Sequence, residues 1–187
     1  MNTVVFTRNK KVTITHTESG MIVSATMQDN NHKIEAVVEI SFPEMSIIAI
    51  SGDMIRVPRP ECHHALGILP KAIGLEIKKG LTLRMEEAIG GNCGCAHLTN
   101  LVMEACHASI QGQYTKFRES FSDILDAMSP DERTRAYLDI HPSIVNTCVV
   151  FREDSEAIRE ARNHPETYRI VKLKEQIASH FNKKPIH

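Results

Sequence analysis

Hydrophobic and polar residues alternate in four short runs between residues 11 and 51. In the first run Val12 and Ile14 share one side and threonines share the other. The stretches 18–20 (Glu-Ser-Gly) and 29–31 (Asp-Asn-Asn) are typical turn sequences. Alternation with a period of two predicts β-strands, and the short turns predict an antiparallel meander with one covered face. The residues expected on that face are Val23, Ala25, Ile34, Ala36, Val38 and Ile50.

Helical spacing replaces the alternation after Gly52. Pro60 suits the first turn of a helix, and the apolar residues after it recur at intervals of three and four. A second helix is predicted from Leu81 to Ile89, where a glycine pair ends it, and a third from about Cys95 to Gln111. The inner face of the first of these helices is expected to carry Cys62, Ala65, Leu66 and Leu69.

The chain beyond residue 112 keeps mainly helical spacing. One amphipathic helix is predicted over 117–128. Ser129 followed by Pro130 is a typical helix start, with the serine as the cap. Two further helices are predicted over 154–163 and 166–181.

The order of these elements indicates an α+β fold, in which an N-terminal antiparallel sheet of about four strands is followed by helices packed on one face. We expect residues 1–112 to form a sheet-plus-helix core. Residues 113–187 should form a helical extension packed on that core, so that the two parts make one structural domain.

The composition excludes several classes of protein. Of the 187 residues 42% are hydrophobic and 24% charged, with a formal net charge of −1. A general nucleic-acid binder needs a basic surface, so we expect no nucleic-acid partner. No apolar run approaches the roughly 20 residues of a membrane helix, so we expect no membrane partner. Residues 1–11 lack the apolar stretch of a signal peptide, which favours a cytoplasmic location and mostly reduced cysteines.

The candidate chemistry centres on residues 90–98, which contain three glycines, two cysteines and a histidine. Cys95 lies at or next to the N-cap of the third predicted helix, where unpaired amides and the helix dipole favour a thiolate. His97 follows in the same turn, so thiolate and imidazole could reach one metal ion. The alternative is a buried structural thiol beside a surface imidazole.

Other cysteines and histidines could complete such a site. Cys62 lies near another helix start with His63 beside it, or is a small core residue. Cys93 forms a C-x-C with Cys95, or is an exposed loop thiol. Asp29 and His32 flank the second predicted hairpin, where backbone reasons alone also explain them. The two cysteines expected in the core are Cys106 and Cys148.

Residues 5–151 resemble a bacterial family known only as domain of unknown function 2889. Its Gly-Gly-x-x-Gly-Cys-Thr-His-Leu stretch corresponds to Gly90–Leu98, and its Pro-x-x-x-Cys segment to Pro58–Cys62. Ala96 replaces the usual threonine, and Arg59 stands where an aromatic residue is common. The family has no established activity, so the resemblance implies a fold and no reaction.

The order of candidate ligands also resembles that of IscU/NifU-type iron–sulfur scaffolds. Those proteins place one ligand at a hairpin, one cysteine at a helix start after the sheet, and a Cys with a neighbouring His at a later helix start. The hairpin cysteine is absent here and the loop spacing differs, so the likeness is an analogy. The residues that follow this order are Asp29, Cys62, Cys95 and His97.

Three functions fit these features. The first is binding of zinc or iron, which thiolate and imidazole ligands suit. The second is a non-catalytic interaction module, whose C-terminal helices bind a protein partner or a second copy of the chain. The third is an enzyme that acts on a small molecule with Cys95 as nucleophile. The predicted ligands are Cys62, Cys95, His97 and Asp29, with His32, Cys93 and His63 as additional candidates.

Overall fold

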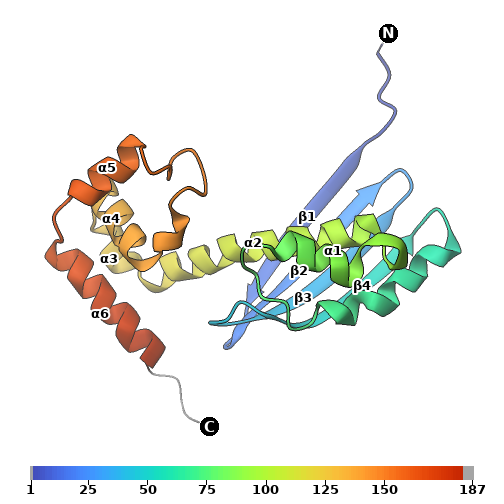
Figure 1. The fold of residues 1–187 in the computed structure, drawn as a ribbon, viewed down its shortest axis with the longest axis horizontal. Coiled ribbons are helices and arrows are strands. Elements are labelled where there is room, and N and C mark those ends of the chain that lie inside the picture. Colours follow the sequence, from blue (N-terminus) through green and yellow to red (C-terminus); the bar gives the residue numbers. More distant parts are fainter. Residues whose placement is uncertain (1, 183–187) are drawn as a thin grey trace. The chain divides into compact units, whose positions relative to one another are not determined.

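The computed structural model of the chain describes residues 2–182, and a four-stranded sheet occupies its N-terminal part (Figure 1). The strands are antiparallel and lie in chain order, as in a meander. The prediction of one antiparallel sheet over residues 11–51 is therefore confirmed, with somewhat longer end strands. The strands are β1 (Arg8–His16), β2 (Gly20–Asp29), β3 (Lys33–Ser41) and β4 (Ile47–Arg56).

Alternate strand residues point into a hydrophobic core that the following helices complete on one side of the sheet (Figure 1). A register shift between Glu39 and Ile40 pairs Ile40 with Ile47 and places both in the core. Ile50, expected on the covered face, is partly buried and packs against this core. The expected residues that are fully buried are Val23, Ala25, Ile34, Ala36 and Val38.

The segment after β4 is a 3₁₀-helix, η1 (Pro60–Ala72), where the sequence predicted an α-helix. Residues three apart lie on one face in both kinds of helix, so the apolar spacing could not distinguish them. Gly52 of β4 lets η1 pack closely, because a Cβ there would lie 3.0 Å from Leu69 Cδ1 and 3.4 Å from Leu66 Cδ2. The residues that η1 buries are Ala65, Leu69 and Ala72.

Two α-helices follow, joined by a short 3₁₀ turn, η2 (Gly91–Cys93). The first, α1 (Leu81–Ile89), has the predicted bounds. The second, α2 (Ala96–Ser120), runs past its predicted end at Gln111. Gly112 does not end this helix; it permits a close contact, because a Cβ there would lie 2.7 Å from Ile14 Cδ1 of β1.

The single helix predicted over 117–128 is broken in the structure. Between α2 and α3 (Ser122–Asp126) stands Phe121, with φ −124° and ψ 23°. Serines precede and follow this residue, and their hydroxyls compete with helical hydrogen bonds. The apolar spacing alone did not reveal the interruption.

Two of the remaining helices, α4 and α5, begin with serine caps. Ser129 and Glu132 form a reciprocal capping box at α4, so the predicted start at Pro130 is confirmed. Ser155 accepts a hydrogen bond from the Ile158 amide at α5. Both later helices lie within about two residues of their predicted bounds. These elements are α4 (Pro130–Ile140), η3 (Pro142–Ile144), α5 (Glu156–Asn163) and α6 (Tyr168–Asn182).

The two cysteines predicted to be core residues differ. Cys106 is buried on α2, as predicted, and burial raises the pKa of its thiol to about 12. Cys148 is exposed, so the second prediction is wrong. Its apolar neighbours Val149 and Val150 are also exposed and lie in a bend and a turn, because a short apolar run without a helix or strand period has no face to bury.

The chain divides into two compact units, residues 1–116 and 117–187. Each contains its own cluster of buried apolar side chains. The packing of a helical extension on the core stays a prediction, which limited proteolysis tests. Within residues 2–182 no helix has the length and apolar character that a membrane span requires.

Candidate functional site

The turn between β2 and β3 is organised by the side chain of Asp29. Its Oδ1 accepts hydrogen bonds from the backbone amides of Asn31 at 2.9 Å and His32 at 2.7 Å. The Asp29 amide in turn donates to the His32 carbonyl at 2.9 Å. This is the local bonding that makes aspartate favourable in turns, as the sequence indicated.

Two arginines from the edge strands hold the same turn. Arg8 of β1 donates from Nε at 3.0 Å and from Nη2 at 2.6 Å to Asp29 Oδ2. Arg56 of β4 donates to the Asp29 carbonyl and, at 3.3 Å, to the His32 carbonyl. The Asp29 carboxylate is 1% exposed. Burial pushes the pKa of Asp29 upward, but the Arg8 side chain and the two amides outweigh it and hold the pKa well below its usual range.

The imidazole of His32 links this turn to the start of α2. His32 Nδ1 lies 3.1 Å from Asp29 Oδ1, so the carboxylate favours the tautomer with the proton on Nδ1. On the other side, the His32 ring lies against the His97 ring, with centroids 4.1 Å apart and planes at 36°. Asp29, His32 and His97 therefore form one contiguous group, built from a hairpin and a helix start.

His97 is the member of this group with an available ring. Within the described residues 2–182 its nitrogens make no hydrogen bond to the protein. Desolvation by burial lowers the pKa of His97, and the nearby His32 and Arg8 lower it further, whereas Asp29 opposes them. The imidazole is therefore favoured as the neutral base, which is the form that binds a metal ion or accepts a proton.

The glycines of the 90–98 motif explain how His97 reaches this position. Gly91 has a φ of +62°, which favours glycine. Gly94 is required by space, because a Cβ there would lie 1.9 Å from the Ile89 carbonyl oxygen. That oxygen also accepts a hydrogen bond from Thr99 Oγ1 at 3.1 Å. The motif thus joins the end of α1 to the first turn of α2, an architectural role that the sequence did not reveal.

The three candidate cysteines differ in their exposure to solvent. Cys95 is partly buried next to the first residue of α2, and its carbonyl accepts a hydrogen bond from the Thr99 amide at 2.9 Å. Cys93 is exposed. Cys62 is partly buried in η1 and packs against the core. Within residues 2–182 no three His, Cys, Asp or Glu side chains are arranged to hold a metal ion, so the sequence-based ligand set stays a prediction.

His63, an additional candidate ligand, has both ring nitrogens beside backbone oxygens. Nδ1 lies 2.9 Å from the Pro60 carbonyl and Nε2 lies 3.0 Å from the Met54 carbonyl. A neutral imidazole carries one N–H and can donate to only one of them at a time. These contacts fasten the start of η1 to the end of β4, which favours a structural role for His63.

Sequence reasoning missed Arg8 and Arg56, although strand register contains a signal for the first. In the β1–β2 ladder His16 pairs with Met21, and each step away from that turn moves one residue along both strands. Eight steps place Arg8 directly opposite Asp29, where opposite charges attract across strands. Counting outward from the turn at 18–20 would have found the pair.

The fold and the site thus define an α+β protein with a histidine–carboxylate group at the hairpin between β2 and β3. Residues 6–111 match a protein family described as "Protein of unknown function (DUF2889)". This is more than half of the chain, and it contains every residue of the group above. The chain belongs to this family, as its motifs indicated. Comparisons with curated proteins and with solved structures gave no significant match. The likeness to iron–sulfur scaffolds stays an analogy.

Proposed function

We propose that the protein binds a transition-metal ion, zinc or iron, through the imidazoles of His32 and His97. The observation that carries the proposal is the contact of Asp29 Oδ1 with His32 Nδ1, on the other side of which the His97 ring lies tilted against His32. Metal-binding histidines commonly donate one ring N–H to a carboxylate, which orients the other nitrogen toward the metal. Asp29 has this position behind His32.

The electrostatics of the group support this proposal. A lowered pKa keeps His97 unprotonated near neutral pH, so a metal ion does not compete with a proton there. Arg8 brings a positive charge into the same region, but it is paired with Asp29. Both Asp29 oxygens already accept hydrogen bonds, which favours an indirect role for this carboxylate over direct ligation.

Two imidazoles leave coordination positions for other ligands. Cys95 precedes His97 by two residues, and its partly buried thiol is the nearest sequence candidate for a third protein ligand. Water would fill what remains, since zinc sites that are not purely structural keep an open position. A reducing, cytoplasmic environment suits the proposal because it keeps this cysteine a thiol.

The test is titration of the tag-free, full-length protein with Zn²⁺, in which calorimetry measures the affinity. His97→Ala should weaken binding at least tenfold, and Asp29→Asn should weaken it by roughly 10- to 100-fold, the usual effect of losing a carboxylate behind a ligand. His107→Ala, an exposed histidine of the same helix, is the matched control and should leave the affinity unchanged.

Cobalt(II) distinguishes the ligand sets. A thiolate-to-cobalt charge-transfer band that disappears in Cys95→Ser would assign the third position to sulfur. Retention of binding without such a band would assign the site to the imidazoles and water. If His97→Ala binds zinc as tightly as the wild type, the proposed site is wrong.

A further inference from the structure

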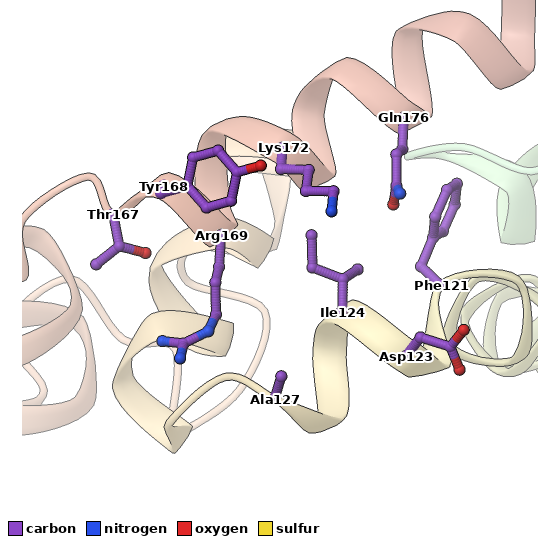
Figure 2. Close-up of a pocket in the computed structure, with 9 residues that line it drawn as sticks. All are labelled: Phe121, Asp123, Ile124, Ala127, Thr167, Tyr168, Arg169, Lys172 and Gln176. Atoms are coloured by element: carbon purple, nitrogen blue, oxygen red, sulfur yellow. The ribbon is translucent and has the colours of Figure 1, made fainter.

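The unit of residues 117–187 contains a groove of about 760 Å³ (Figure 2). One wall is the first half of α6, and the opposite wall is α3 with the residues beside it. Apolar groups line the α3 side, namely Phe121, Ile124 and Ala127. The polar residues of the groove are Asp123, Thr167, Tyr168, Arg169, Lys172 and Gln176.

Charge is unevenly distributed along this groove. Figure 2 shows Arg169 toward one end, Lys172 near the middle above Ile124, and Asp123 at the other end beside Phe121. The Arg169 guanidinium lies 3.5 Å from the buried Glu132 carboxylate, which partly neutralises it. Lys172 Nζ lies 5.9 Å from the centre of the Tyr168 ring. Within residues 2–182 the ion pairs of α6 use Arg169 and Lys174, so Lys172 is available to an anionic group.

The groove extends along about two turns of α6. On α6 its lining residues include Tyr168, Lys172 and Gln176, each four positions after the last. Eight residues of α-helix rise about 12 Å, or just over two turns. The groove is also open, since Tyr168 is 76% exposed and the Arg169 side chain 51%. Small ligands usually bury 70–90% of their surface, whereas a bound amphipathic helix keeps its outer face in solvent.

We propose that this groove binds one amphipathic, acidic helix of a partner protein. Its apolar residues, spaced three and four apart, would lie on Ile124 and Ala127, beside the largely buried Phe121. Its carboxylates would face Arg169 and Lys172. The position of Asp123 sets a direction, because a basic residue of the ligand is favoured only at that end. No residue of the histidine group lines this groove, and the inference does not depend on metal binding.

Two synthetic peptides of about 14 residues, a length at which an isolated helix becomes marginally stable, serve as probes. Both carry the same apolar stripe. The acidic peptide has glutamates on the flank that meets Lys172, and the basic peptide has lysines at the same positions. Fluorescence anisotropy with the full-length chain measures both affinities. The acidic peptide should bind at least fivefold more tightly, and the preference should shrink as salt is raised.

Charge reversal on the protein locates the binding surface. Lys172→Glu should weaken the acidic peptide about fivefold, the effect of one exposed ion pair, and should strengthen the basic peptide by a similar factor. Arg159→Glu on α5 makes the same change of net charge outside the groove, and should alter neither affinity appreciably. Ala127→Trp should weaken both peptides, because Ala127 is an exposed residue on the apolar wall.

Three outcomes would overturn the proposal. The wild-type chain could bind the two peptides equally, which would remove the role of Arg169 and Lys172. Arg159→Glu could match the effect of Lys172→Glu, which would reduce the preference to net charge. Failure of both peptides to bind at millimolar concentration would show that the groove does not accept a helix. Far-ultraviolet circular dichroism confirms that each variant is folded before its affinity is compared.

Discussion

Replacement of Gly94 by alanine should destabilise the unit of residues 1–116 more than any other glycine-to-alanine change in the 90–98 motif. The added Cβ would lie 1.9 Å from the Ile89 carbonyl oxygen, whereas real Cβ atoms stay about 3.0 Å or more from such atoms. The loop or the end of α1 must therefore move by about 1.1 Å, the difference between these distances. That shift also weakens the hydrogen bond from Thr99 Oγ1 to the same carbonyl.

The expected cost is about 2–4 kcal/mol. Overpacking contributes about 1–3 kcal/mol and the weakened hydrogen bond about 1 kcal/mol. Two other glycines provide graded controls. Gly91→Ala meets no atom within 4 Å but has a positive φ, so it should cost about 1–2 kcal/mol. Gly67→Ala meets no atom and has no such φ, so its effect should stay within about 0.5 kcal/mol.

Urea-dependent labelling of Cys106 is a suitable assay, because a chain with two units need not unfold in one step. This thiol is buried in the sheet–helix core and reacts only when that core opens. Mass spectrometry of its peptide gives the opening free energy of the first unit alone. If Gly94→Ala and Gly67→Ala agree within about 0.5 kcal/mol, the close approach of Gly94 to Ile89 does not stabilise the connection between α1 and α2.

Three further outcomes are expected. Gly112→Ala should be more favourable by about 1 kcal/mol when introduced into Ile14→Val than when introduced into the wild type, because Ile14→Val removes the Cδ1 atom that crowds the new methyl group while helix propensity still improves. Equal effects of Gly112→Ala in the two backgrounds, measured by urea unfolding, would disprove the contact. Because the pKa of His97 is lowered in the folded protein, the unfolded chain takes up a proton first as pH falls through roughly 6.5. Stability should therefore decline below that pH, and His97→Gln should reduce the decline. If the pH profile of the urea midpoint is the same in His97→Gln and the wild type, this reasoning is wrong. In the folded protein an exposed Cys93 should react with a thiol reagent much faster than Cys106, and equal rates would contradict the buried position.

The sheet was predictable because one of its faces is buried. A strand with one covered face must alternate, so the burial of Val23, Ala25 and Val38 follows from a period of two. The start of α4 was predictable for a different reason. The Ser129-Pro130 pair satisfies unpaired amides locally, and its effect does not depend on tertiary packing.

The failures arise where one residue type serves two structural purposes. Gly112 suggested a helix end, but it stands in mid-helix because Ile14 leaves no room for a side chain. The apolar residues of η1 suggested an α-helix, but a three-residue interval suits a 3₁₀-helix equally well. Both errors need the position of a distant segment for their correction, and a local pattern does not contain it.

Part of the site could also be predicted from the sequence. The possibility that Asp29 and His32 approach the start of α2 was open, and the structure brings His32 against His97. Cys62 and Cys95 were grouped with them because both are thiols near predicted helix starts. Each begins or adjoins a helix, yet which way a helix start faces depends on loops such as the one at Gly94, whose geometry follows from contacts with α1.

Asp29 and His97, the two ends of the histidine group, differ in the hydrogen bonds that they make. Asp29 receives hydrogen bonds from Arg8, Asn31 and His32, and so joins β1 to the hairpin. Its removal should disturb the turn as well as any ligand. Within the described residues the His97 ring makes no hydrogen bond, and its loss leaves those contacts in place. A defect shared by both variants would therefore point to the structure of the turn, whereas a defect of His97→Ala at unchanged stability would point to chemistry at its imidazole.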